Sequence, residues 1–203
     1  MKKTVGVMLA AAALVAFALY SYSRPASFRN SIAPSKLSAD QQDIVDLLLI
    51  SGKQELCIFD FVTDKPYSSI DVWVEVYKDG EIIEYPAGVS VHSDTAEKRA
   101  GRVTIVSNEN DSTYQWTLSV LEDGGKSSHI GTTEIIIEPA LARFYGAMVE
   151  PANIENGKEI IIYSSLFSGE SLILAFDCQT LEERPELLKD YPYAHLVKCK
   201  FTK

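Results

Sequence analysis

The chain has 203 residues, of which 46% are hydrophobic, with 19 basic and 28 acidic side chains and a net charge of −9. This much apolar and aromatic material excludes a chain that is disordered throughout. The first 36 residues hold five of the basic residues and no acidic one, which leaves 14 basic and 28 acidic residues in 37–203. A region with a net charge of −14 and no basic stripe repels phosphates, so we expect no nucleic-acid partner.

The N-terminus has the pattern of a segment addressed to a membrane. Lys2 and Lys3 precede an uncharged run from Val5 to Tyr20, which is 16 residues long. A signal peptide needs an apolar core of about 7–15 residues and a membrane-spanning helix needs about 20, so the run lies between the two. We therefore predict that residues 1–23 form one hydrophobic helix that serves as a membrane anchor or as a signal segment.

Two features bear on the fate of this segment. The small-x-small triplet Ala16-Phe17-Ala18 predicts cleavage after Ala18, which would release a secreted protein. Tyr20 and Tyr22 instead suit the aromatic belt of a retained helix, and we favour this anchored form. With the short basic tail inside, the remainder of the chain would lie outside the cytoplasm, attached to the cell membrane by a single pass.

The anchor is followed by a predicted tether and a single β-rich region. Residues 24–36 are rich in Ser, Arg, Asn and Pro without apolar periodicity, which predicts a flexible tether. The domain is expected to occupy 37–203. Its first element is a helix from Ala39 to Ile50, since Ser38 and Gln41 have the spacing of a capping box.

Period-two alternation dominates the next hundred residues. Ile70, Val72, Val74 and Val76 alternate with polar and aromatic side chains, and Lys78-Asp79-Gly80 predicts a hairpin turn. About seven short strands are expected, at Cys57–Phe61, Ile70–Tyr77, Glu81–Tyr85, Val89–His92, Arg102–Val106, Tyr114–Leu121 and Thr132–Ile137. Their close spacing predicts a mainly β protein with an antiparallel β-sandwich or a barrel-like domain.

The C-terminal part has a β-β-α-β order. Strands are predicted at Glu159–Phe167, Ser171–Asp177 and His195–Phe201, with a helix at Leu181–Lys189 that Pro185 interrupts. The preceding stretch, Ala140–Val149, fits either a short helix or a strand. We expect this part to pack against or complete the earlier sheets, with a sub-boundary near 139–158.

The strongest candidate for a binding surface is the outward face of one predicted strand. Asp71, Trp73, Glu75 and Tyr77 lie on the same face, and acids beside aromatic rings are common on sugar-binding surfaces. The solvent face of any antiparallel sheet can have this composition, and we weigh that interpretation more heavily.

Cysteine and histidine give little evidence of chemistry. There are three cysteines, Cys57, Cys178 and Cys199, and the last two are expected on core-facing strand positions. A Cys178–Cys199 disulfide is possible there outside the cytoplasm, but buried free thiols are just as common at such positions. The histidines, His92, His129 and His195, are scattered and expected to be exposed. We predict no catalytic residue, no metal site and no cofactor.

Three functions follow from this organisation. The first is a non-enzymatic binding or interaction module that is held at the membrane and recognises a protein or a cell-wall carbohydrate. The second is a cell-wall or carbohydrate-processing enzyme that uses Asp71 and Glu75 as paired carboxylates. The third is an accessory subunit that docks on a membrane complex through the helix Ala39–Ile50.

Overall fold

The computed structural model describes residues 30–49, 54–64, 66–92, 99–110, 113–122, 125–134, 142–169 and 176–203. The predicted anchor or signal segment, 1–23, and the predicted cleavage site after Ala18 lie outside the described residues. Among the helices of the described ranges, none is long and apolar enough to cross a membrane.

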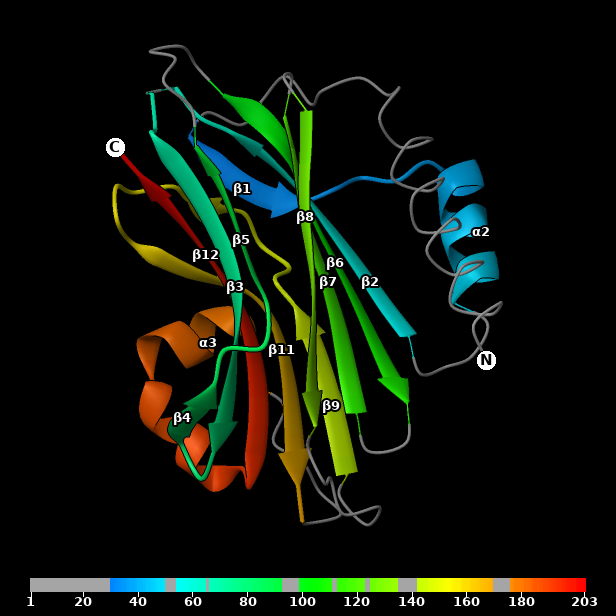
Figure 1. The fold of residues 1–203 in the computed structure, drawn as a ribbon, viewed down its shortest axis with the longest axis vertical. Coiled ribbons are helices and arrows are strands. Elements are labelled where there is room, and N and C mark those ends of the chain that lie inside the picture. Colours follow the sequence, from blue (N-terminus) through cyan, green and yellow to red (C-terminus); the bar gives the residue numbers. More distant parts are fainter. Residues whose placement is uncertain are drawn as a thin grey trace.

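The described strands form two antiparallel sheets, which confirms the predicted mainly β fold and gives it the form of a sandwich (Figure 1). The first sheet has the order β10-β1-β2-β6-β7-β8, with bounds Ala152–Asn153, Ser31–Pro34, Gln54–Val62, Ala100–Asn110, Thr113–Glu122 and Gly125–Glu134. The second has the order β4-β3-β12-β11-β9, with bounds Glu81–Glu84, Ser69–Lys78, Tyr193–Thr202, Glu159–Ser168 and Ala142–Ala147. In addition, β5 (Gly88–His92) pairs with β3.

The core lies between the two sheets and follows the period-two pattern of the sequence. Ile70, Val72, Val74 and Val76 of β3 are all at most 1% exposed, as their alternation predicts. Across the core, the rings of Phe61 on β2 and Phe201 on β12 meet edge to face with their centroids 5.4 Å apart. Burying an aliphatic or aromatic side chain of this size contributes about 1.5–3 kcal/mol, so these alternating positions supply much of the folding free energy.

The predicted tether, 24–36, is wrong over its last residues, because Ser31–Pro34 forms strand β1. This strand pairs with β2 on one side and with the short β10 on the other. Ile32 is fully buried in the common core, so the folded domain includes Ser31–Pro34 and does not start only at Leu37. The sequence pattern failed here because a four-residue strand that ends in proline has too few positions to show alternation.

Helix α2 (Ala39–Leu48) confirms the predicted leading helix and its capping box. The Ser38 hydroxyl accepts from the Gln41 backbone N–H, while the Gln41 side chain accepts from the Ser38 N–H. The helix packs on β2 through Val45 and Ile58, in a small cluster that is separate from the main core. Figure 1 shows α2 set to one side of the sandwich.

Strand β8 is longer than predicted, and the β3–β4 hairpin is as predicted. β8 begins at Gly125 and not at Thr132, because most side chains in its first half are polar and exposed and so show no apolar alternation. In the hairpin, Asp79 and Gly80 both have positive φ, at 50° and 81°, as a two-residue type I′ turn requires.

The C-terminal part completes the second sheet. β12 lies between β3 and β11, and the stretch Ala140–Val149 contributes strand β9. A sub-boundary near 139–158 does not separate two cores, since residues on both sides of it belong to one hydrophobic cluster. Of the predicted strand Ser171–Asp177, residues 171–175 lie outside the described residues, and the last two are not in a strand.

The predicted helix Leu181–Lys189 is two helices. Helix α3 runs over Cys178–Glu183, and its N-cap Asp177 accepts from the Thr180 backbone N–H at 2.7 Å. A 3₁₀ helix follows over Pro185–Asp190. Proline has no N–H to donate and its ring crowds the preceding turn, which explains why the helix divides at this point.

Candidate functional site

The predicted face of β3 is a hydrogen-bonded network centred on Glu75. The Glu75 carboxylate accepts from the Trp73 indole N–H at 2.9 Å and from the Tyr77 hydroxyl, and it pairs with the Lys198 ammonium at 2.8 Å. Lys198 also contacts Glu159, at 3.1 Å. Three of the four predicted residues are thus brought together, while the fourth, Asp71, accepts hydrogen bonds from Ser69 and Ser90.

The charges in this network compensate one another. Burial alone would raise the pKa of Glu75, but hydrogen bonds from Lys198, Tyr77 and Trp73 together lower it below its ordinary value. Glu75 and Tyr77 are only 4% and 8% exposed, so the carboxylate is enclosed and its donors are already engaged. This arrangement stabilises the second sheet and leaves the Glu75 carboxylate little capacity to receive a ligand.

The spacing of Asp71 and Glu75 does not suit glycoside hydrolysis. Residues four apart on a strand are separated by about 13 Å, whereas the two carboxyl groups of glycosidases lie about 5–10 Å apart. The geometry of β3 therefore favours a structural role for this face over a catalytic one.

His195 is not exposed, contrary to the sequence-based expectation. Its imidazole is 0% exposed, with the rings of Tyr114, Trp116 and Phe167 at centroid distances of 4.9, 5.4 and 5.1 Å. Neither ring nitrogen has a hydrogen-bond partner among the described residues, and burial lowers the pKa of His195 to about 3. The imidazole is therefore neutral near pH 7 and packs as an aromatic core residue. The alternation of β12 could have indicated this, because His195 falls in register with Val197, Cys199 and Phe201.

The Cys178–Cys199 disulfide that the sequence left possible is not formed in the structure, where all three cysteines are free thiols. Cys178 begins helix α3 and does not lie on a strand, so the geometric premise of the pairing fails. Burial raises the pKa of Cys57 and of Cys178 to about 12, and it raises that of Cys199 well above its ordinary value. Protonated thiols are poor nucleophiles and poor metal ligands. Within the described ranges, no group of three or more His, Cys, Asp and Glu side chains could hold a metal ion.

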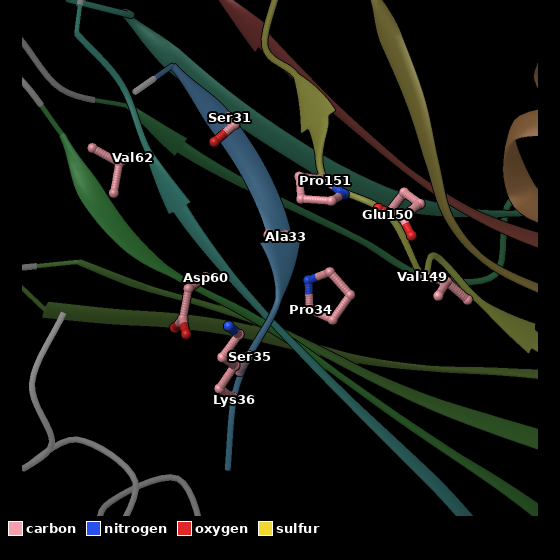
Figure 2. Close-up of a pocket in the computed structure, with 10 residues that line it drawn as sticks. All are labelled: Ser31, Ala33, Pro34, Ser35, Lys36, Asp60, Val62, Val149, Glu150 and Pro151. Atoms are coloured by element: carbon pink, nitrogen blue, oxygen red, sulfur yellow. The ribbon is translucent and has the colours of Figure 1, made fainter. Parts of the chain in front are cut away.

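A groove beside β1 is the site that the sequence did not predict. It has a volume of about 390 Å³ and lies on the outer face of the first sheet. Figure 2 shows β1 in its centre, with Asp60 and Val62 of β2 on one side and the segment 149–151 on the other. Its lining consists of Ser31, Ala33, Pro34, Ser35, Lys36, Asp60, Val62, Val149, Glu150 and Pro151.

The strand pattern explains which side chains face this groove. Ile32 of β1 and Phe59 and Phe61 of β2 point into the core, so Ala33 and Val62, which alternate with them, point outward. The segment leading into β10 supplies the opposite wall, where Val149 is 74% exposed. The walls of the groove are therefore mostly apolar.

Two buried hydroxyl groups give the groove its polar character. Ser31 is 5% exposed, and neither its hydroxyl nor that of Ser35 has a hydrogen-bond partner among the described residues. At the edge, Lys36 and Glu150 are exposed, whereas the Asp60 carboxylate accepts from Arg102 Nε at 2.8 Å. Apolar walls around a few polar groups without partners are the usual composition of a ligand site. The sequence did not indicate this site, because the whole of β1 and the residues that follow it, up to Lys36, were assigned to the predicted tether.

Apolar side chains are also exposed away from the groove, and those on α2 and β4 lie in pairs. On α2, Ile44 is 43% and Leu47 is 68% exposed, because the helix contacts the sheet through Val45. On the edge strand β4, Ile82 and Ile83 are 42% and 53% exposed. The exposed apolar side chains of α2 agree with the partial exposure that a docking role for this helix requires.

The architecture is a two-sheet antiparallel β-sandwich with a small surface groove next to its first described strand. A family model described as "YgaN domain" matches residues 31–201, and the chain belongs to this family. The match begins at the first residue of β1 and ends in β12. Comparison with curated proteins and with solved structures found no significant match.

Proposed function

We propose that the chain is a membrane-anchored, extracytoplasmic and non-enzymatic binding module that holds its ligand in the β1 groove. The observation that carries this proposal is the pair of buried hydroxyls, Ser31 and Ser35, which lie without partners among the described residues in a groove with mostly apolar walls. Unpaired buried polar groups are costly, and a ligand that hydrogen-bonds to them recovers that free energy. The fold by itself supports no particular activity.

The sequence before the domain supports the membrane part of the proposal. Lys2, Lys3 and the uncharged run Val5–Tyr20 have the composition of an anchor. Only eleven residue steps separate Tyr20 from Ser31, which span at most about 40 Å when fully extended. An anchored chain would therefore hold the groove close to the membrane surface, within reach of membrane proteins or of the cell wall.

The test of this topology is protease treatment of intact cells that express the chain with an epitope tag after Lys203. We expect the tagged domain to be digested without lysis and the protein to fractionate with membranes. N-terminal sequencing adds a second readout, because Leu19 as the first residue of protein in the medium would indicate the secreted form. Digestion that requires lysis would contradict both forms.

A second candidate function is that of an accessory subunit that docks through α2, which the exposure of Ile44 and Leu47 favours. Replacing both residues with aspartate would then prevent co-purification with a membrane complex, whereas a groove variant such as V149D would not. Loss of the complex with V149D alone would point to the groove instead.

A further inference from the structure

The lining of the β1 groove restricts the chemistry of what it can hold, and this argument rests on the proposed binding function. No aromatic side chain is among the ten described residues that line it, although sugar sites depend on stacking against aromatic rings. A hydrocarbon chain would satisfy Pro34, Val149 and Pro151, but it would leave the hydroxyls of Ser31 and Ser35 unpaired. A strongly anionic ligand would meet two carboxylates and one ammonium group.

We propose that the β1 groove binds an extended peptide segment of a partner protein, with small apolar side chains against Pro34, Val149 and Pro151 and its main-chain groups hydrogen-bonded to Ser31 and Ser35. A polypeptide supplies apolar side chains for the apolar walls, and N–H and C=O groups for the hydroxyls of Ser31 and Ser35. A volume of about 390 Å³ accommodates a few residues and not a folded surface.

The edge of β1 determines how this segment is held. β10 pairs with Ser31 and Ile32 only, and the next position on β1 after Ala33 is Pro34. Proline has no N–H to donate, so an added strand could not continue the ladder along this edge. The peptide is therefore held by side-chain hydroxyls and apolar contact and does not extend the sheet.

Charge selects among peptides. Glu150 is exposed at the edge of the groove, and residues 37–203 carry 14 basic against 28 acidic side chains. A segment with a Lys or Arg beside its apolar residues is attracted to this surface, whereas an acidic segment is repelled. The charge of the domain also disfavours a second copy of the same chain as the partner.

The experiment is selection of a phage-displayed library of random 12-residue peptides on the full chain held in lipid nanodiscs. We expect enriched peptides with small apolar residues next to a basic residue. Their affinity, measured by fluorescence anisotropy, should fall at least tenfold in V149D and about fivefold in S31A. The variant I83D, at an exposed position of edge strand β4, is the matched control and should bind as the wild type does.

The stability of S31A shows whether Ser31 acts in ligand binding or in holding the fold together. Because its hydroxyl has no partner among the described residues, S31A should unfold at the same urea concentration as the wild type or at a higher one. Absence of any enriched peptide, or enriched peptides that bind V149D and S31A as tightly as the wild type, would overturn the proposal. Binding of tetra-N-acetylglucosamine or palmitate that V149D abolishes would overturn the peptide class while leaving the binding function in place.

Discussion

Glu75 lies on the outward-facing side of β3 and is nevertheless enclosed by its own partners. Trp73, Tyr77 and Lys198 all bond to its carboxylate, and Lys198 joins it to Glu159. Asp71, on the same face, accepts from the hydroxyls of Ser69 and Ser90. Removing Glu75 would therefore take one carboxylate partner from the Lys198 ammonium group, whereas removing Asp71 would take an acceptor from these hydroxyl groups.

Replacing Glu75 with alanine should lower the free energy of unfolding by about 2–4 kcal/mol, because Lys198 would lose a partner while remaining mostly buried. The matched change, D71A, should cost less than about 1 kcal/mol, since it removes hydrogen bonds at a more exposed position. Urea unfolding of both variants measures the difference. Equal losses in the two variants would contradict the role assigned to the Glu75 network.

His195 makes the stability of the protein depend on pH. Its pKa is about 3 in the folded protein and about 6.5 in the unfolded chain, so between these values the unfolded state binds the extra proton. The stabilisation is complete above pH 6.5 and is lost progressively as the pH falls towards 3. From pH 7 to pH 5 this one group should cost about 2 kcal/mol.

The variant H195F places another ring among the same aromatic neighbours and removes this proton. It should lose about 2 kcal/mol less than the wild type between pH 7 and pH 5, as measured by urea unfolding at each pH. H129Q, at an exposed position on β8, should follow the wild-type curve. An unchanged slope in H195F would show that His195 does not titrate on unfolding.

At the scale of elements, α2 is attached to the sandwich more weakly than the strands are to one another. Its contact with β2 is the small cluster around Val45 and Ile58, outside the main core. Helices of this length are marginal in isolation, so the capping box at Ser38 and Gln41 carries a large share of the stability of α2.

The variant S38A should therefore unfold α2 locally and leave the sheets intact. A lost N-cap costs about 0.5–2 kcal/mol, which predicts faster amide hydrogen exchange in residues 39–48 by about two- to thirtyfold. Exchange in β3 and β12 should not change. Equal acceleration in the sheets would mean that α2 and the sandwich unfold as one unit.

Sequence patterns predicted the strands that show apolar alternation or follow a clear turn signal, as β4 follows Asp79-Gly80, and missed those that have neither. The alternation of Ile70 to Val76 indicated β3 correctly, since eight or more residues sample both faces of a strand. β1 has four residues and the first half of β8 is polar, so neither shows the pattern. The burial of His195 and the groove beside β1 depend on which strands become neighbours. The alternation within a single strand does not indicate its neighbours.

For the whole molecule, the sequence did not distinguish a β-sandwich from a barrel, and the pairing of the strands does. A sandwich or a barrel was expected, and the structure has two sheets whose edges approach each other where Gly131 of β8 meets Pro86. A Cβ atom on Gly131 would lie 1.9 Å from the Pro86 carbonyl oxygen, so only glycine fits there. At another edge, β1 and the segment before β10 meet and enclose the groove.

The proposal that the domain lies outside the cytoplasm, with its groove accessible, is tested most directly by labelling V149C with a membrane-impermeant maleimide on intact cells. Val149 is 74% exposed and lines the groove, while Cys57 is half-buried and Cys178 and Cys199 are buried, so labelling of the native thiols should be slow. We expect rapid labelling of V149C without permeabilisation and little labelling of the wild type. Labelling that appears only after the cells are permeabilised would contradict the proposal.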